Sequence, residues 1–398
     1  MKREYFSHNS QSPCCSDQTV SGFSISGPFD IAAMKILCDR TQLQEAFAIV
    51  SSVVPSKTTK PILQNVLLTA NENGITLFAT DLEMAVKVQL EAVKVTKEGK
   101  VLLPARECAA LLRELSDPTV TLDSTDMRCR IESGGGSFVL LGENPADFPE
   151  EAKIKPGRGM KMPAGRLLQM IKETAFAAAR EETRYAINGV MMDFGGSCLR
   201  MVATDGRRLS ISYYNLDGGK GEFKALVPVR ALATLARAIP DSSKEELTIS
   251  VGDKQIEFAF GKVHLLSQQL ESRFPDYEGV VPKAADTTVE INRSMLESSL
   301  RKAAILCSDD LRMVRFEVQE SALRLTAESN SRGRADVSMD ITKKGAGGSI
   351  NFNPDYILEA LRVCNLDSVR LDMSDDSMPA KFTLGESFTY IVMPISGT

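Results

Sequence analysis

Two aspartates at matching points of the chain are the residues best placed to do chemistry. Asp81 and Asp205 each follow Ala-Thr at the end of a short alternating apolar stretch, in TLFATDLEM and LRMVATDGRRL. Such carboxylates could form an acid–base pair or bind magnesium. An aspartate directly after a strand more often closes an Asx turn by accepting backbone hydrogen bonds. We therefore favour a structural role, with a carboxylate-dependent enzyme as the alternative from another functional class.

Other patterns for catalysis or metal binding are weak. The sequence has two histidines, His8 and His264, and its eight cysteines include no C-x-x-C pair, which argues against a zinc site. His264 has no neighbouring nucleophile motif. The run Gly134–Gly136 lacks the Lys-Ser/Thr that completes a phosphate-binding loop. We therefore predict no catalytic residue, no metal and no cofactor, and a binding protein rather than an enzyme.

The two aspartates belong to a threefold repeat. A third stretch, LRLTAESNSRG, shows the same alternation, and Ala79, Ala203 and Ala327 follow one another at equal intervals of 124 residues. Each copy contains two strand–helix half-units, whose helical parts carry apolar residues at i, i+3, i+4 and i+7. Hairpin turns are predicted at Asn73-Gly74 and Gly195-Gly196. Six similar helices therefore recur along the chain.

These repeats predict an α+β fold of three tandem domains. Amphipathic helices cannot bury their apolar stripes alone, so the two helices of each domain must pack on antiparallel sheets. We expect domains over residues 34–155, 156–284 and 285–398. Residues 1–33 are predicted to be a disordered N-terminal extension or a misassigned start, since Met34 opens the first periodic segment.

Composition limits the functional classes. The 398 residues are 43% hydrophobic and 25% charged, with a net charge of −5, which argues against nucleic-acid binding through overall basicity but not through a local basic face. Basic residues recur on the predicted helices, where a solvated surface is the simpler interpretation. No apolar run approaches the roughly 18 residues that span a bilayer. Scattered cysteines indicate a reducing, cytoplasmic location.

Several motifs resemble those of the bacterial sliding clamp family, the β subunit of DNA polymerase III. They are ATDGRRL, RFPDY and YIVMPI, supported by KPILQNVLL, NPADFP and FNPDYILEAL, and the resemblance runs from Met34 to about Ile395. It implies a homodimer closed head to tail into a six-domain ring around duplex DNA. Such a ring would be a processivity factor for DNA replication, with the replicative polymerase alpha subunit, the clamp loader and other clamp-binding proteins as partners and no membrane. Closure by two-fold symmetry would cover the sheet edges at the ends of the array.

The resemblance also implies three sets of site residues. The dimer interface would join Phe138 and Leu140 to Ile305 and Leu306 of the partner subunit. Sequence-independent contacts with DNA phosphates would come from Lys57, Arg106, Arg180, Arg184, Arg208 and Arg230. A pocket for peptide motifs would comprise Ile187, Thr204, Gly206, Arg207, Arg208, Leu209, Pro282, Asn353, Tyr356, Pro379, Ile391, Val392, Met393, Pro394 and Ile395.

Two features depart from the family pattern. Arg207 stands where the best-known members have histidine, and Ser396-Gly397-Thr398 replaces their basic and apolar tail. These departures motivate a second interpretation within the same fold, a clamp paralogue kept for resistance to an inhibitor.

Overall fold

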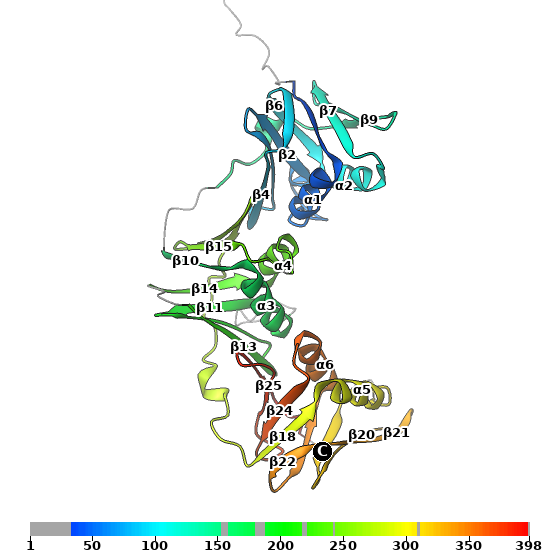
Figure 1. Cartoon of the computed structure of the whole chain (residues 1–398), viewed down its shortest axis with the longest axis vertical. Coiled ribbons are helices and arrows are strands. Elements are labelled where there is room, and N and C mark those ends of the chain that lie inside the picture. The colour runs from blue at the N-terminus through cyan, green and yellow to red at the C-terminus, as the bar shows by residue number, and fades with distance from the viewer. Residues whose placement is uncertain are drawn as a thin grey trace, which may run out of the picture.

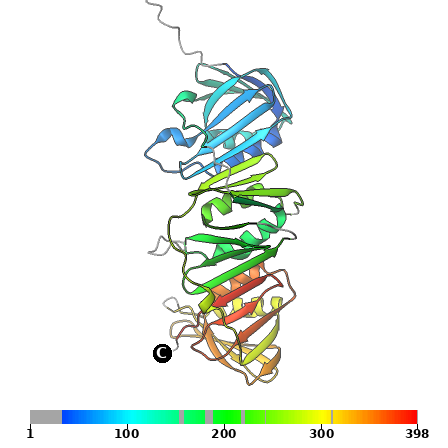
Figure 2. The ribbon, with the colours of Figure 1, turned by 90° about the vertical axis from the view of Figure 1, so that its left-hand side faces the viewer.

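The computed structural model describes residues 33–152, 158–179, 188–216, 221–241, 243–308 and 311–396. Over these residues the chain forms three similar α+β domains that follow one another in a curved, elongated array (Figure 1). Broad sheets form one long face and helices cover the opposite face, as the turned view also shows (Figure 2). None of the described helices is long and apolar enough to cross a membrane.

The first domain packs two helices and a 3-10 turn with nine strands. The helices are α1 (Arg40–Ser51) and α2 (Ala105–Glu114), and η1 is Pro61–Gln64. The strands are β1 (Lys35–Asp39), β2 (Asn65–Asn71), β3 (Gly74–Thr80), β4 (Met84–Leu90), β5 (Val93–Lys97), β6 (Gly99–Pro104), β7 (Thr119–Thr125), β8 (Arg128–Ser133) and β9 (Gly136–Leu141). A short turn, η2 (Pro145–Asp147), leads out of the domain.

The second and third domains repeat this order. The second contains α3 (Ala164–Thr174), η3 (Ala175–Ala177), α4 (Val229–Ala238), and strands β10 (Arg158–Pro163), β11 (Gly189–Gly195), β12 (Cys198–Thr204), β13 (Arg208–Asn215), β14 (Glu222–Pro228), β15 (Glu246–Val251), β16 (Gln255–Phe260) and β17 (Val263–Gln268), followed by η4 (Glu278–Val280). The third contains α5 (Arg293–Ala304), α6 (Pro354–Val363), and strands β18 (Thr287–Asn292), β19 (Val314–Val318), β20 (Ala322–Ser329), β21 (Gly333–Asp340), β22 (Thr342–Gly345), β23 (Gly348–Phe352), β24 (Ser368–Met373), β25 (Ala380–Thr383) and β26 (Phe388–Val392).

The predicted helical stripes form the core between helices and sheets. On α1 the buried residues are Leu43, Ala46, Phe47 and Val50, which is the stripe that the spacing predicts. Asp39 caps this helix by accepting a hydrogen bond from the amide of Gln42. The fold class of three tandem domains, each with two helices on antiparallel sheets, is confirmed. The domain boundaries after residues 155 and 284 stay predictions.

Sheets run without interruption from one domain to the next. An eight-stranded sheet, in the order β10-β15-β16-β17-β4-β3-β2-β6, joins the first two domains, and a nine-stranded sheet, β14-β11-β12-β13-β26-β25-β24-β18-β22, joins the last two. We call the antiparallel pairing of β4 with β17 the first junction and that of β13 with β26 the second junction. Two smaller sheets, β5-β1-β7-β8-β9 and β21-β20-β19-β23, end on β9 and β21 as edge strands. Each junction thus pairs the fourth strand of one domain with the last strand of the next.

Candidate functional site

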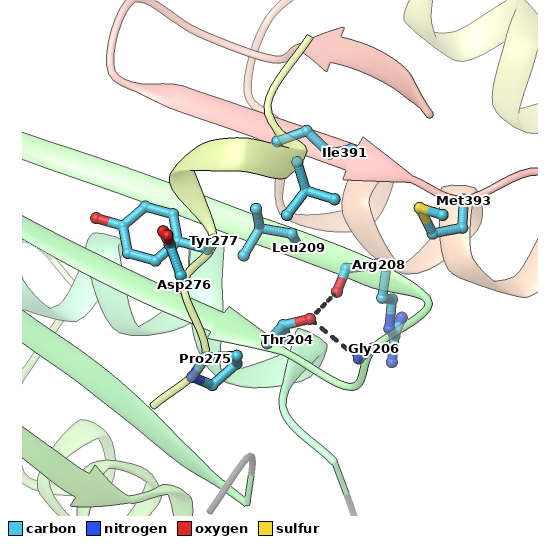
Figure 3. A pocket seen from close by; sticks show the side chains of 10 residues that line it. Thr204, Gly206, Arg208, Leu209, Pro275, Asp276, Tyr277, Ile391 and Met393 are labelled. Atoms are coloured by element: carbon cyan, nitrogen blue, oxygen red, sulfur yellow. Dashed lines mark hydrogen bonds between the residues drawn. The ribbon is translucent and has the colours of Figure 1, made fainter. Parts of the chain in front are cut away.

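A cavity of about 220 Å³ opens on the nine-stranded sheet at the second junction (Figure 3). It lies on the sheet face that points away from the helices, which we call the outer face. Strand β13 and the turn before it contribute one wall, and β26 and the segment after it contribute another. The segment between β17 and β18 closes the third side (Figure 3). The lining residues are Thr204, Gly206, Arg208, Leu209, Pro275, Asp276, Tyr277, Val280, Ile391 and Met393.

The turn between β12 and β13 shapes one end of the cavity. The carboxylate of Asp205 accepts hydrogen bonds from the amides of Arg207 at 2.9 Å and Arg208 at 3.1 Å. The hydroxyl of Thr204 donates to the Arg208 carbonyl at 2.6 Å and accepts from the amide of Gly206 at 3.0 Å (Figure 3). Gly206 has φ of +84°, a conformation that glycine adopts without strain. Asp205 therefore closes an Asx turn, as predicted.

The equivalent turn in the first domain has the same construction. Asp81 accepts hydrogen bonds from the amides of Glu83 at 3.0 Å and Met84 at 2.7 Å. Both aspartates are thus engaged by backbone amides, which confirms the structural role. No group of three or more His, Cys, Asp and Glu side chains that could hold a metal ion occurs among the described residues.

Arg208 is buried beneath the cavity, with 5% of its side chain exposed. Its guanidinium donates to Asp205 at 3.0 Å, to the Phe176 carbonyl at 2.8 Å and to Glu359 of α6. It also lies over the ring of Tyr356, 4.6 Å from the ring centre. Burial works against the charged form, yet neighbouring Tyr390 and Glu359 raise the pKa of Arg208 above its ordinary value. This arginine therefore fixes the third domain against the second.

An apolar cluster lies under the cavity on the outer sheet face. Its buried members are Val202, Leu209, Ile211, Leu226, Phe274 and Ile391. Phe274 and Tyr277, from the segment that follows β17, meet edge to face at 6.3 Å between ring centres. Burial raises the pKa of Tyr277, whose hydroxyl has no hydrogen-bond partner among the described residues. The cavity can therefore accept apolar side chains of an extended ligand.

Six of the predicted pocket residues line the cavity. They are Thr204, Gly206, Arg208, Leu209, Ile391 and Met393. The prediction missed four lining residues, Pro275, Asp276, Tyr277 and Val280. The first three belong to the motif RFPDY, which is one of the motifs that resemble the sliding clamp family. This motif was the signal in the sequence that could have identified them.

The remaining predicted pocket residues lie around the cavity or elsewhere. Arg207 is exposed, and its carbonyl accepts a hydrogen bond from the amide of Met393 at 2.8 Å. Val392 pairs with Arg208 across the second junction, and Asn353 caps α6. Pro282, Pro379, Pro394 and Ile395 do not line the cavity, and the amide of Ile395 donates to the Asn351 carbonyl at 2.9 Å. Ile187 lies outside the described residues.

The predicted phosphate-binding residues occupy different environments. Lys57 and Arg106 are exposed and form no ion pair with another described residue. Arg230, on α4, pairs with Asp81 at 2.5 Å but keeps 53% of its side chain exposed. The structure argues against a phosphate contact for Arg208, because its side chain is buried and its charge is matched by two carboxylates. Arg180 and Arg184 lie outside the described residues.

Apolar residues are exposed on the edge strand β9 at one end of the array and beside the edge strand β21 at the other. On β9, Phe138 is 40% exposed, and Leu140 is partly buried. Ile305, at the end of α5, is 70% exposed, and Leu306 follows it. Since α5 packs beside β21, each end of the chain presents an unpaired strand together with apolar side chains.

Comparisons with known proteins agree with this geometry. Family models of the DNA polymerase III beta subunit match residues 34–152 (N-terminal domain), 161–276 (central domain) and 278–396 (C-terminal domain). Beta sliding clamps of Escherichia coli K12 and of Synechocystis are each 29% identical, over 91% of this chain and 100% and 99% of their own lengths. The crystal structure of the beta subunit from Thermotoga maritima superimposes with a TM-score of 0.87 at 25% identity, covering 92% of this chain and all of that one. A Pseudomonas aeruginosa clamp solved with bound griselimycin gives a TM-score of 0.85 at 26% identity over the same shares.

Proposed function

Because this chain belongs to the DNA polymerase III beta subunit family, and is thus a non-catalytic processivity factor, we propose how its own residues perform that role. Two copies close head to tail around duplex DNA, in the cytoplasm. The cavity at the second junction holds peptide motifs of the polymerase and of other clamp-binding proteins. The continuous sheets, with the edge strands β9 and β21 at the two ends of the array, are the observation that carries this proposal. Neither an enzyme built on Asp81 and Asp205 nor a separate resistance function is favoured.

The proposed ring contact repeats the two junctions within the chain. At these junctions Leu265 lies opposite Val86, and Tyr390 lies opposite Ser210. The last hairpin of the first domain is β8–β9, and that of the second domain is β16–β17. In each, the last strand begins after a two-residue loop, at Gly136 and at Val263, so Phe138 corresponds to Leu265. By the same pairing rules, Ala335 of the partner subunit would lie opposite Phe138. The helix contacts α1·α4 and α3·α6 at the two junctions predict that α5 meets α2 of the partner subunit.

The dimer is tested by charged substitutions at the exposed apolar residues. We expect Phe138→Asp combined with Ile305→Asp to halve the particle mass measured by light scattering, because each ring contact would bury unpaired carboxylates. Leu366→Asp, which changes another exposed apolar residue, is the matched control and should leave the mass unchanged. A doubly substituted protein that still has twice the chain mass would refute the contact.

The proposed DNA contacts are electrostatic. The six described helices share the face opposite the broad sheets (Figure 1), and Lys57, Arg106 and Arg230 are its proposed phosphate ligands. We expect Arg106→Glu and Arg230→Glu each to weaken DNA binding and to lower the slope of log affinity against log salt by about 1. Lys254→Glu, an exposed lysine between β15 and β16, is the control. Unchanged slopes for both arginine variants would rule out these contacts.

The proposed peptide site rests on the apolar cavity at the second junction. We expect Met393→Ala to weaken binding of a polymerase-derived clamp-binding peptide about tenfold, since lost burial of its side chain costs about 1.4 kcal/mol. Met378→Ala changes an exposed methionine outside the cavity and should have no effect. Equal affinities for the two variants, measured by fluorescence polarisation, would place the peptide elsewhere.

A further inference from the structure

A second cavity, of about 280 Å³, opens on the outer sheet face at the first junction. Strand β4 contributes Ala85 and Lys87, and β17 contributes His264 and Leu266. The lining is completed by Phe78, Glu151, Ala152 and Glu257. Nothing in the proposed ring closure, DNA contacts or peptide binding uses this cavity.

The repeat makes this cavity the counterpart of the one at the second junction. A shift of 124 residues carries Phe78 onto Val202, Ala85 onto Leu209 and Leu102 onto Leu226. These residues belong to two separate apolar clusters, each on the outer face of its sheet. Across the junctions, Leu266 lies opposite Ala85 as Ile391 lies opposite Leu209. The two cavities therefore occupy the same place in successive domains.

The linkers after the first two domains cover the clusters in the same way. Phe148 packs edge to face on Phe78 at 5.9 Å, and Glu151 and Ala152 then form one side of the cavity at the first junction. Phe274 occupies the corresponding place in the second cluster, before Tyr277 and Val280. In the third domain the same shift carries Val202 onto Thr326 and Leu209 onto Gly333, so neither position has a large apolar side chain there. The apolar floor is therefore a property of the first two domains.

The cavity at the first junction contains two carboxylates and two basic side chains. Lys87 contacts both carboxylate oxygens of Glu151 at 3.0 Å, so this pair is neutral. Glu257 has His264 at 3.3 Å, and an imidazole balances it only when protonated. Glu257 lies opposite Leu266 in the sheet, so a carboxylate stands beside an apolar side chain of this cavity. Glu257 is therefore a carboxylate of this cavity that pairs with no described lysine or arginine.

We propose that the cavity at the first junction is a second peptide site, for an extended segment of another protein in which a leucine or phenylalanine adjoins a lysine or arginine. The apolar side chain would contact Phe78, Ala85 and Leu266, and the basic side chain would pair with Glu257. This inference rests on the proposed function, because it assumes that outer cavities at the junctions accept peptides.

The test uses two fluorescent peptides on the full-length protein. One carries Leu-Phe flanked by lysines, the other carries Leu-Phe flanked by aspartates, and both contain a benzophenone photo-crosslinker beside the phenylalanine. We expect the lysine peptide to crosslink to β4 or β17 and to lose about tenfold in affinity with Glu257→Lys, with a smaller loss for Glu257→Gln. Thermal unfolding of each variant checks that the fold is retained.

The outcomes separate this inference from the proposed function. Crosslinks of the lysine peptide confined to β13 or β26, or an affinity that Glu257→Lys leaves unchanged, would overturn the second site. Loss of polymerase-peptide binding at the second junction is measured independently with Met393→Ala. If Met393→Ala leaves the affinity of the polymerase peptide unchanged while the affinity of the lysine peptide depends on Glu257, the proposed peptide site at the second junction is wrong and the second site stands.

Discussion

Both junctions place an arginine against the Asx turn that precedes the fourth strand of a domain, but only one of these arginines is buried. At the first junction Arg230 reaches from α4 of the second domain to Asp81 at 2.5 Å and to the Val53 carbonyl at 2.9 Å. At the second junction Arg208 comes from β13 itself and contacts Asp205 and the Phe176 carbonyl. The exposed fractions of the two side chains are 53% and 5%.

This difference separates two roles that look alike in sequence. Arg230 is half exposed although its partner Asp81 is buried, so Arg230 can keep its turn contact and still present charge to an anion such as a DNA phosphate. A buried guanidinium must have all its charge matched, and Arg208 meets Asp205, Glu359 and two aromatic rings. The second junction is therefore the more tightly fixed, and it is the one that carries the apolar cavity.

The third domain repeats part of this arrangement at the open end of the chain. Arg332, in the turn before β21, donates to the Cys307 carbonyl at 3.0 Å. Cys307 follows α5 as Val53 follows α1 and as Phe176 follows α3. In all three domains, therefore, an arginine donates a hydrogen bond to a backbone carbonyl just after the first helix. At the open end it forms within one chain, before any partner is bound.

The largest expected effect comes from removing the buried arginine. Arg208→Met should lower the free energy of unfolding by about 3 kcal/mol, because Asp205 and Glu359 would remain partly buried without their cation. Arg230→Met is the matched control and should cost less, about 1 kcal/mol, because Arg230 is half exposed and serves one carboxylate, and Asp81 keeps its two amide hydrogen bonds. Calorimetry on both variants measures the difference, and equal losses would mean that burial does not distinguish the junctions.

A smaller effect is expected from the tyrosine beside Arg208. Tyr390 is buried, its hydroxyl donates to the Tyr356 carbonyl at 2.9 Å, and burial raises its pKa above the ordinary value. Tyr390→Phe should therefore cost about 1 kcal/mol at neutral pH. Leu265 stands at the equivalent place in the first junction, where no hydroxyl is present.

The same tyrosine predicts how stability depends on pH. A tyrosine whose pKa is raised in the folded state keeps its full contribution below the unfolded value of about 10 and loses it as the pH rises above that value. The wild type should therefore lose stability above about pH 10 more steeply than Tyr390→Phe. Urea unfolding at pH 8 and pH 11 measures this, and parallel losses in the two proteins would contradict the assignment.

The smallest expected effects concern the two Asx turns. Gly206 has φ of +84°, and Leu82 holds φ of +79° at the same place in the first turn. Gly206→Ala should destabilise the chain by about 1 kcal/mol, since a side chain is strained in this conformation. Leu82→Gly relieves similar strain and should change stability by less than about 1 kcal/mol. Thermal unfolding compares them, and a larger loss for Leu82→Gly would show that packing of the leucine side chain outweighs the strain at this position.

The sequence alone determined the features that depend on local periodicity and local turn chemistry. The interval of 124 residues, the stripe Leu43, Ala46, Phe47 and Val50, and the Asx turns at Asp81 and Asp205 are each written within a short window. Six lining residues of the cavity were predicted through the family resemblance of the motifs ATDGRRL and YIVMPI, which contain them. Helix period, strand alternation and aspartate capping need no knowledge of distant contacts.

Only the tertiary structure decided which distant segments meet. The pairing of β13 with β26 joins residues about 180 positions apart, and the sequence of neither strand identifies the strand with which it pairs. The segment containing Pro275 and Tyr277 became a cavity wall because it crosses the outer sheet face, and Arg208 became a junction residue because α6 brings Glu359 to it. Whether an arginine is free for DNA or bound within the fold depends on its burial and partners, which only long-range packing sets.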